Sequence, residues 1–366
     1  MTNPRSSSKE RLLSSPSTPF ETTAEQSTDD LLSRMEKISF QGRNLATARR
    51  IWERMVSDDV LIFFGMAGAL TAGGLRLTIA QLIHNRAFDC LVSTGANLYH
   101  DLHETRGRHH YLGDPKANDA ELQAHHIDRV YDTYINEDEF IDNDSWIASF
   151  AASLESRPYT SREFLYELGG FLWQQTRADG ILTAAYRQQL PIYCPAIADS
   201  SLGMGLSQAR HVDQTAGKID VIADIIESAN LVHRQPHTAS IVLGGGTPKN
   251  FINQASVQAG FYDERITGHQ YAIQLITDTP YFGGASGSTL NEAQSWGKLS
   301  AEADQITVHA DATLAFPLLT SAFVNSAAKR LEERVAPQFV THGRSLSVNG
   351  SPVPATQFLT SKDQKS

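Results

Sequence analysis

The chain has few cysteines, no concentration of basic residues and no long apolar run. Its two cysteines, Cys90 and Cys194, each lie in an apolar, strand-like stretch where a buried free thiol is usual, so we expect no disulfide. No segment reaches the roughly 20 apolar residues that cross a bilayer, and the amino terminus lacks the apolar run of a secretory signal. We therefore expect a cytoplasmic protein without a membrane segment.

The charge balance of the 366 residues is acidic, with a formal net charge of -10 at pH 7. Without a basic block, the sequence gives no reason to expect nucleic acid or an anionic membrane as a partner, and an acidic balance suits small cationic ligands. Apolar residues make up 41% and charged residues 20% of the chain, which is typical of a globular protein with room for one large domain or two ordinary ones.

The two ends of the chain differ in composition from its middle. Residues 1–30 are rich in serine and threonine with few apolar anchors, which indicates a disordered amino-terminal arm. Residues 31–335 are expected to form a single catalytic domain. Residues 336–366, which include Pro352 and Pro354, are expected to form a polar carboxy-terminal tail.

Between the ends, apolar strand patterns alternate with glycine-rich turns and helical patterns. The strand patterns lie at residues 60–64, 90–93, 192–194, 240–243, 272–277 and 305–309, and a helix is expected from the last of them to about residue 335. Continuous apolar strands between helices predict an α/β fold, a doubly wound and mostly parallel sheet with helices on both faces, as in Rossmann-like NAD-binding proteins. Ligands of such sheets bind beyond the carboxyl ends of the strands, where these glycines fall, so a dinucleotide site is the first hypothesis.

The turn after residues 240–243 is the clearest of these strand-to-helix turns. Three glycines are followed by Thr247, which we expect to cap a helix whose first residue is Pro248. Because the chain lacks a strict G-x-G-x-x-G, the glycines also fit a simpler interpretation in which they only turn the chain. More specific residues are needed to decide between the two.

Residues 283–298 read G-G-A-S-G-S-T-L-N-E-A-Q-S-W-G-K and supply that specificity. They closely resemble the signature of the deoxyhypusine synthase family, a glycine and serine loop followed by E-A-x-S-W-G-K. Three further stretches match in order and spacing: L-G-G-G at 243–246, D-x-S-L-G at 199–203, and A-D-A-T-L at 310–314 followed by F-P-L-L at 316–319. The similarity covers roughly residues 40–330.

The resemblance implies an NAD-dependent transferase of alkyl groups in which Lys298 carries the transferred group as an imine. Outside this motif a single lysine is usually a solvated surface charge. An imine-forming amine must be deprotonated at neutral pH, which requires a desolvated or positively charged setting. Trp296 would exclude water and offer its ring face to a cationic substrate. The family works as a tetramer with its NAD and active sites at subunit interfaces, so we expect a homotetramer.

The resemblance also implies a set of cofactor-binding residues, with Asp311 and Ala312 reaching the NAD of a neighbouring subunit. Carried over by position, the set consists of Gly68, Ala69, Leu70, Thr71, Ala72, Thr94, Gly95, Ala96, Asp199, Gly245, Thr277, Asp278, Asp311 and Ala312.

The chain departs from the family at several substrate-binding positions. Met204 replaces the last carboxylate of D-G-S-L-G-D, and Ala285, next to Ser286, replaces the acid of G-S-D-S-G. Tyr99 and His100 stand where the family has two glutamates. The histidine that follows L-G-G-G-x-x-K in the family is Asn250 here.

One signature carboxylate, Glu292, remains. His100 is a candidate proton acceptor if its pKa lies near neutrality, and a structural role in a polar interior is equally open.

These changes bear on the substrate. Each charge-assisted contact to an ammonium contributes roughly 1.5–3 kcal/mol, so losing two acids makes spermidine a doubtful donor. We expect a small amine of polyamine metabolism, as in the homospermidine synthases that resemble this family. A true deoxyhypusine synthase that modifies a protein lysine with spermidine is the alternative, and a non-catalytic NAD-binding regulator is the second.

Six of the thirteen histidines lie in one segment, namely His100, His103, His109, His110, His125 and His126. We interpret residues 106–126 mostly as an exposed loop over the site. No metal site is expected, because no cysteine or carboxylate completes a standard ligand spacing. A sirtuin-like deacylase would share the NAD fold, but its structural zinc needs two C-x-x-C pairs, which two isolated cysteines do not supply.

Overall fold

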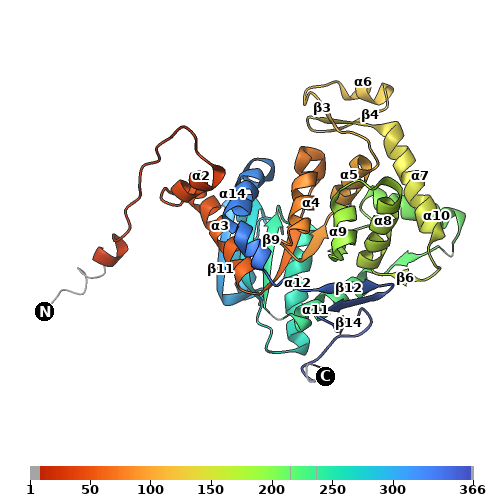
Figure 1. The fold of residues 1–366 in the computed structure, drawn as a ribbon. Coiled ribbons are helices and arrows are strands. Elements are labelled where there is room, and N and C mark those ends of the chain that lie inside the picture. Colours follow the sequence, from red (N-terminus) through yellow and green to blue (C-terminus); the bar gives the residue numbers. More distant parts are fainter. Residues whose placement is uncertain (1–8, 215, 236, 364–366) are drawn as a thin grey trace.

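The computed structural model of the chain describes residues 9–214, 216–235 and 237–363 (Figure 1). Its centre is a sheet of six parallel strands in the order β11-β10-β9-β1-β2-β7. Their bounds are β1 (Leu61–Met66), β2 (Cys90–Ser93), β7 (Ile192–Tyr193), β9 (Thr238–Leu243), β10 (His269–Ile276) and β11 (Leu299–His309). If the six strands are numbered in chain order and read across the sheet from β7, their order is 3-2-1-4-5-6. This is the order of a doubly wound sheet, so the predicted α/β fold is confirmed.

Side chains of the central strands alternate between two apolar layers, as the period of a strand requires. In β1, Ile62 and Phe64 belong to the larger core, whereas Leu61 and Phe63 belong to the smaller one. All six residues of β1 are buried, which explains the continuous apolar pattern. Cys90 and Cys194 are buried free thiols, as expected.

Helices cover both faces of the sheet (Figure 1). The larger core joins the sheet to α3 (Phe40–Ser57), α4 (Arg76–His84), α5 (Gly95–Thr105), α8 (Ser161–Thr176), α9 (Ile181–Gln188) and α14 (Ala312–Glu333). Trp52 of α3 stacks on Phe323 of α14 with ring centroids 4.1 Å apart. The smaller core joins the sheet to α11 (Val221–Arg234) and α12 (Gly246–Tyr262).

The carboxy-terminal segment is folded, which differs from the predicted polar tail. Three antiparallel strands, β12 (Phe339–His342), β13 (Ser345–Val348) and β14 (Ser351–Val353), form a small sheet. Phe339, Leu346 and Val348 are buried in the smaller core. The strands have only three or four residues each and polar turns between them, so their apolar alternation is too brief to stand out in the sequence.

The described part of the predicted arm ends in a helix. Ser27 and Asp30 form a capping box at the start of α2 (Thr28–Met35), and Leu32 of this helix is buried in the larger core. The first eight residues of the predicted arm lie outside the described residues.

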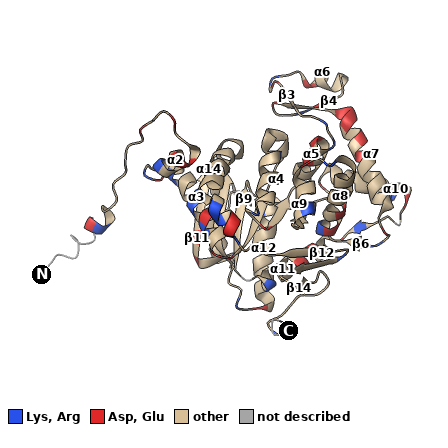
Figure 2. Ribbon diagram, in the orientation of Figure 1, with Lys and Arg blue, Asp and Glu red and all other residues tan. Residues whose placement is uncertain are grey.

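The elements between α5 and α11 that lie outside the central sheet include two small sheets, β3-β5-β4 and β6-β8. The elements are β3 (Tyr111–Leu112), α6 (Asp119–Ala124), β4 (Ile127–Val130), β5 (Thr133–Asn136), α7 (Glu137–Ser153), β6 (Pro158–Tyr159), α10 (Ser201–Val212) and β8 (Lys218–Ile219). Acidic residues mark α7, whose first turn holds three of them (Figure 2). Residues 106–126 are mostly exposed, as predicted, but they are not all loop, because they include β3 and α6, and the side chain of His110 is largely buried.

None of the helices in the described ranges has the length and apolar content that a membrane crossing needs.

Candidate functional site

A crevice of about 260 Å³ opens at the carboxyl ends of β1, β9, β10 and β11. Its position is the point at which the strand order reverses, between β1 and β9, where doubly wound sheets bind ligands. Several of the residues predicted to hold NAD or substrate line it, namely Gly68, Leu70, Gly245, Thr277, Asp278, Ser286, Asp311 and Ala312. The other lining residues are Ala67, Leu243, Gly244, Leu275, Ile276 and Ala310.

The loop after β1 is held in shape by the start of α5. Gly68 has a φ of +65°, and a Cβ at this position would point into open space. Thr94, the N-cap of α5, donates from Oγ1 to the Gly68 carbonyl at 2.7 Å. Asn97 Oδ1 accepts the backbone N–H of Thr71 at 3.2 Å, and Thr71 is fully buried. Thr71 and Thr94 therefore shape the loop rather than face the crevice with their hydroxyls.

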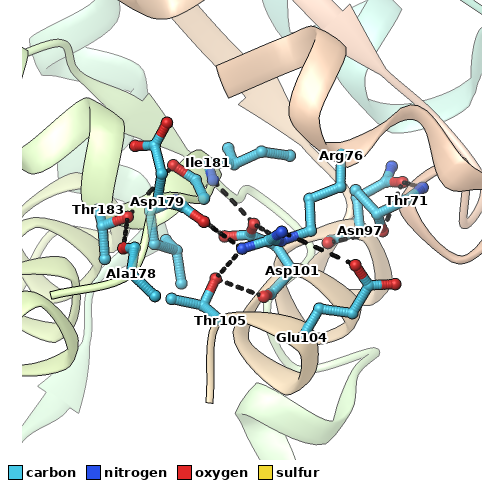
Figure 3. Close-up of polar contacts among 12 residues, drawn as sticks. Thr71, Arg76, Asn97, Asp101, Glu104, Thr105, Ala178, Asp179, Ile181 and Thr183 are labelled. Carbon is cyan, nitrogen blue, oxygen red and sulfur yellow. Dashed lines mark hydrogen bonds and ion pairs between the residues drawn. The ribbon is translucent and has the colours of Figure 1, made fainter. Parts of the chain in front are cut away.

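Behind this loop a buried ion pair joins three helices (Figure 3). Arg76 at the start of α4 donates from Nε to Asp101 Oδ1 at 3.0 Å and from Nη2 to Thr105 Oγ1 at 2.8 Å. Asp101 of α5 also accepts the backbone N–H groups of Ile181 and Leu182 at 2.8 and 2.9 Å, which caps α9. Burial raises the pKa of the Asp101 carboxyl, although Arg76 and the α9 amides oppose this.

The turn after β9 brings its glycines against residues 283–289, which we call the serine loop. A Cβ on Gly245 would lie 2.5 Å from the Ser286 Cα, so only glycine fits this approach. Helix α12 begins at Gly246 with Gly245 as its N-cap and no side-chain cap, so the prediction that Thr247 caps it is wrong. Instead, Ser286 Oγ accepts the Gly246 N–H at 3.0 Å.

Lys249 in the first turn of α12 is almost completely buried, at 1% exposure. Its ammonium donates to the Ser288 carbonyl, to Ser288 Oγ at 3.1 Å and to the Ser286 carbonyl at 3.4 Å. Burial, with a smaller contribution from the neighbouring Lys298, lowers the pKa of Lys249 to about 8, and Glu292 opposes the shift. The structure thus places a buried ammonium against the serine loop, one residue of which, Ser286, lines the crevice.

The serine loop leads into α13 (Leu290–Ser295), which starts with a capping box. Glu292 Oε2 accepts from Thr289 Oγ1 at 2.8 Å and from the Thr289 backbone N–H, and these two bonds lower the pKa of the Glu292 carboxyl. The carboxylate predicted to bind substrate therefore also holds the start of α13.

Lys298 lies in the turn between α13 and β11. Its backbone N–H donates to the Ala293 carbonyl at 2.9 Å, and its carbonyl accepts the His269 N–H at 3.1 Å. Gly297 reverses the chain with a φ of +69°. The Lys298 Nζ is 5.8 Å from the centroid of the Trp296 ring, and Trp296 is 72% exposed. The side chains of Lys298 and Trp296 are thus neighbours on an open surface.

His100 lies away from this surface, on α5, in a chain of hydrogen bonds. His110 donates from Nδ1 to Glu104 Oε1 at 2.6 Å, and its Nε2 accepts from His100 Nδ1 at 2.8 Å. Burial, and then the imidazoles of His110 and His103, lower the pKa of His100 to about 3. A pKa near neutrality, the condition for His100 as a proton acceptor, is therefore not met within the chain.

Within the described ranges, no three histidine, cysteine or acidic side chains are grouped closely enough to hold a metal ion.

Comparison with known proteins bears on what this site does. The model of the deoxyhypusine synthase family matches residues 30–323. The chain is 42% identical over 321 residues to the probable deoxyhypusine synthase 2 of Methanosarcina mazei, covering 87% of this chain and 92% of that protein. It is 38% identical over 297 residues to the deoxyhypusine synthase-like protein of Coxiella burnetii, covering 80% and 84%. The chain belongs to the deoxyhypusine synthase family.

A solved structure shows the same fold at low identity. A crystal structure described as a deoxyhypusine synthase from Entamoeba histolytica superposes with a TM-score of 0.58 at 16% identity, covering 83% of this chain and 96% of that one. Membership of the deoxyhypusine synthase family supports an NAD-dependent transfer of an aminobutyl group.

The positions at which this chain departs from the deoxyhypusine synthase family fall in different parts of the molecule. Ala285 is exposed in the serine loop, and Asn250 is half-buried on α12. Met204 is 53% exposed on α10, close to the start of α5, because Ser200 packs against Gly95. Asp199 is exposed in the same segment. Ala69 lies in the loop after β1, Ala72 in the helical turn Thr71–Leu75 and Ala96 in the first turn of α5, and none of the three lines the crevice.

Sequence reasoning gave no role to Lys249, Asn97 or the pair of Arg76 and Asp101. Lys249 occupies the lysine position of L-G-G-G-x-x-K, which is the one available signal. The burial of the other three depends on contacts between separate helices, which no local pattern reveals.

Proposed function

We propose that this chain catalyses the NAD-dependent transfer of an aminobutyl-type group through an imine on Lys298. The observation that carries the proposal is a continuous path of contacts: Ser286 lines the crevice, Lys249 binds Ser286 and Ser288, and Lys298 follows the helix that this loop starts.

The crevice has the features that a dinucleotide needs. Gly244 and Gly245, which line the crevice directly before α12, allow close approach of a ligand to the backbone. Carboxylates of Asp278 and Asp311 offer acceptors for ribose hydroxyls. At about 260 Å³ the crevice is smaller than the roughly 300–1,000 Å³ of typical small-molecule sites. Because the family to which the chain belongs builds its NAD sites at subunit interfaces, we propose a homotetramer in which a neighbouring subunit completes the site.

The residues of the chain have separate roles in the transfer. Bound at the crevice, NAD would supply the hydride acceptor for oxidation of the carbon that bears the donor amine, and its reduced form would supply the hydride that reduces the final imine. Lys298, as a neutral amine, attacks the imine carbon of the oxidised donor, and the donor's other amine fragment leaves with the proton that Lys298 loses. The acceptor amine then displaces Lys298, which regains a proton from it. Trp296 provides an aromatic face for the cationic chain of the substrate.

The substrate that we propose is a small amine rather than a protein lysine. Met204 and Ala285 offer no carboxylate to an ammonium, and a neutral His100 adds no charge. A substrate with fewer positive charges than spermidine therefore fits better. Deoxyhypusine formation on a protein lysine is the second candidate, because relatives at 42% identity are named probable deoxyhypusine synthases.

The test is to incubate the purified protein with NAD and a panel of isotopically labelled amines, followed by borohydride reduction and peptide mass analysis. The expected result is a reduced adduct on the peptide that contains Lys298, with free-amine products in the supernatant. A protein that binds NAD but forms no adduct with any amine would instead be a non-catalytic regulator. An adduct on a different peptide would overturn the assignment of Lys298.

A further inference from the structure

The side chain of Gln274 is a buried amide on β10, beside the candidate crevice. Gln274 is 1% exposed, and its strand neighbours Ile273 and Leu275 belong to the larger core. Because side chains alternate along a strand, Gln274 points to the opposite face, on which Ala272 belongs to an apolar cluster with Leu290 of α13. An amide on this face needs hydrogen-bond partners to offset the cost of its burial.

Gln274 finds these partners in two turns that line the crevice. Its Nε2 donates to the Gly244 carbonyl at 2.9 Å and to the Ser286 carbonyl at 3.1 Å. Carbonyls only accept hydrogen bonds, so the NH2 group rather than the amide oxygen must face them, and both of its hydrogens are used. One side chain thus joins the turn after β9 to the serine loop at Gly244 and Ser286, which both line the crevice.

Ser286 is the crevice residue that this amide places. Its Oγ accepts the Gly246 N–H at the start of α12 at 3.0 Å, and its carbonyl also accepts from the Lys249 ammonium at 3.4 Å. A Cβ on Gly245 would lie 2.5 Å from the Ser286 Cα, so the two segments touch without a side chain between them. Residues 281–285, which lead into Ser286, are exposed. Hydrogen bonds therefore do more than apolar packing to hold Ser286 at the crevice.

We propose that Gln274 is a positioning residue for the cofactor crevice: its amide holds Ser286 at the start of α12 and so fixes the shape of the crevice before NAD binds. This inference rests on the proposed function only in taking the crevice as the NAD site. Gln274 does not itself line the crevice, so it acts through Ser286. A loop that is already held in place loses less conformational freedom when a ligand binds, which raises the affinity for that ligand.

The first test measures the NAD affinity of the full chain by calorimetry, without any amine. Gln274→Met keeps the length of the side chain and removes both donors, so it is expected to bind NAD about tenfold more weakly than the wild type. In the NAD-free variant, hydrogen exchange is expected to be faster in peptides that cover residues 244–248 and 283–289. Gln270→Met is the matched control, because Gln270 also lies on β10 but its Oε1 accepts the Thr238 N–H toward the amino end of the strand. This control is expected to keep the wild-type NAD affinity.

A double-variant cycle with Ser286→Ala separates positioning from a general loss of stability. If Gln274 acts by placing Ser286, its loss matters little once the Ser286 hydroxyl is gone. The double variant is therefore expected to bind NAD within about twofold of Ser286→Ala alone. Additive losses of affinity, or wild-type affinity in Gln274→Met, would overturn the proposal. Gln274→Asn keeps an amide that is one methylene too short to reach both carbonyls, and it replaces Gln274→Met in the cycle if that variant does not fold.

These outcomes distinguish the role of Gln274 from the proposed function. A wild-type protein that binds NAD and transfers no amine, but whose variants show the expected losses of NAD affinity, would refute the proposed transfer and leave the role of Gln274 intact. A wild-type protein that binds no NAD would overturn both.

Discussion

The sheet has two lateral ends, one at β11 and the other at β7, and the polar groups near them differ in where they find hydrogen-bond partners. At the end formed by β9, β10 and β11, the crevice, the serine loop and the Lys298 turn have exposed aromatics, glycines and a buried lysine bound only to neutral atoms. At the end formed by β2 and β7, the helix α5 and its neighbours bury a closed network of imidazoles, carboxylates and an arginine. At the first, which we call the open end, polar groups remain accessible to ligands. At the second, which we call the closed end, polar groups find their hydrogen-bond partners within the chain.

The contrast separates two kinds of polar residue that look alike in a sequence. His100 and Lys298 were both predicted as catalytic from their motif positions. His100 is 7% exposed and bonded to another histidine, whereas Lys298 lies beside an exposed tryptophan. A polar group on an exposed surface can reach a substrate. A buried polar group whose hydrogen bonds are made within the chain mainly stabilises the fold.

The largest effect is expected at the open end, from Lys298→Arg. Arginine keeps the positive charge but forms no imine, so group transfer should fall by about a thousandfold or more while NAD affinity changes little. Transfer is measured with labelled amine, and NAD affinity by calorimetry. Lys329→Arg on the exposed face of α14 is the matched control. Equal borohydride trapping of labelled substrate by Lys298→Arg and the wild type would show that another residue is the nucleophile.

The sheet was predictable, and the details of the site were predictable only in part. Continuous apolar strands with glycine turns gave the doubly wound fold, and β2 was predicted to the residue, because burial on both faces leaves a local pattern. The start of α12 was misplaced because the group that binds its first N–H comes from Ser286, forty residues later. Lys249 was missed for the same reason, since its partners Ser286 and Ser288 are remote in sequence.

At the closed end, the largest effect is expected from Asp101→Ala. The substitution leaves Arg76 buried without its carboxylate and removes the acceptor for two N–H groups of α9. Breaking a buried pair in this way costs about 3–5 kcal/mol of unfolding free energy. Urea unfolding measures the change.

The exposed ion pair of Asp119 and Arg129 provides the control for Asp101→Ala. Asp119 binds Arg129 through two hydrogen bonds, at 2.7 and 2.8 Å, but its side chain is 67% exposed. Asp119→Ala should therefore lower the free energy of unfolding far less than Asp101→Ala does. Equal losses for the two variants would mean that the Arg76 and Asp101 pair does not behave as a buried one.

As the pH falls below neutrality, the closed end is expected to lose stability before the open end does. Burial lowers the pKa of His100 to about 3 and that of His103 to about 4, from an ordinary 6.5. Between pH 6.5 and these lowered pKa values, the unfolded chain binds more protons than the folded one. The contribution of the two neutral imidazoles to the free energy of unfolding is therefore fully present above pH 6.5 and is lost as the pH falls toward 4. The two groups together should remove about 2–4 kcal/mol by about pH 4.5.

Hydrogen exchange at acid and neutral pH locates this loss. Faster exchange is expected on acidification in α5 and β3, with a smaller change in β9 and β10. In His100→Asn, which has no group to protonate, the loss of stability should be reduced. A uniform increase in exchange across the sheet would show that the imidazole network is not the acid-sensitive element.

The smallest effect is expected from restoring acids at the substrate positions with Met204→Asp and Ala285→Asp. Met204 lies near the closed end on α10 and Ala285 in the serine loop, so the single variants report which end contacts the donor. Both positions are exposed in the chain, so a new carboxylate gains less than a buried one, and the double variant should bind spermidine about tenfold more tightly. Calorimetry measures the affinity, and the corresponding double asparagine variant controls for size and polarity without charge. If the unmodified protein already labels a protein lysine from spermidine faster than any free amine, other groups have replaced the lost carboxylates and the small-amine proposal is wrong.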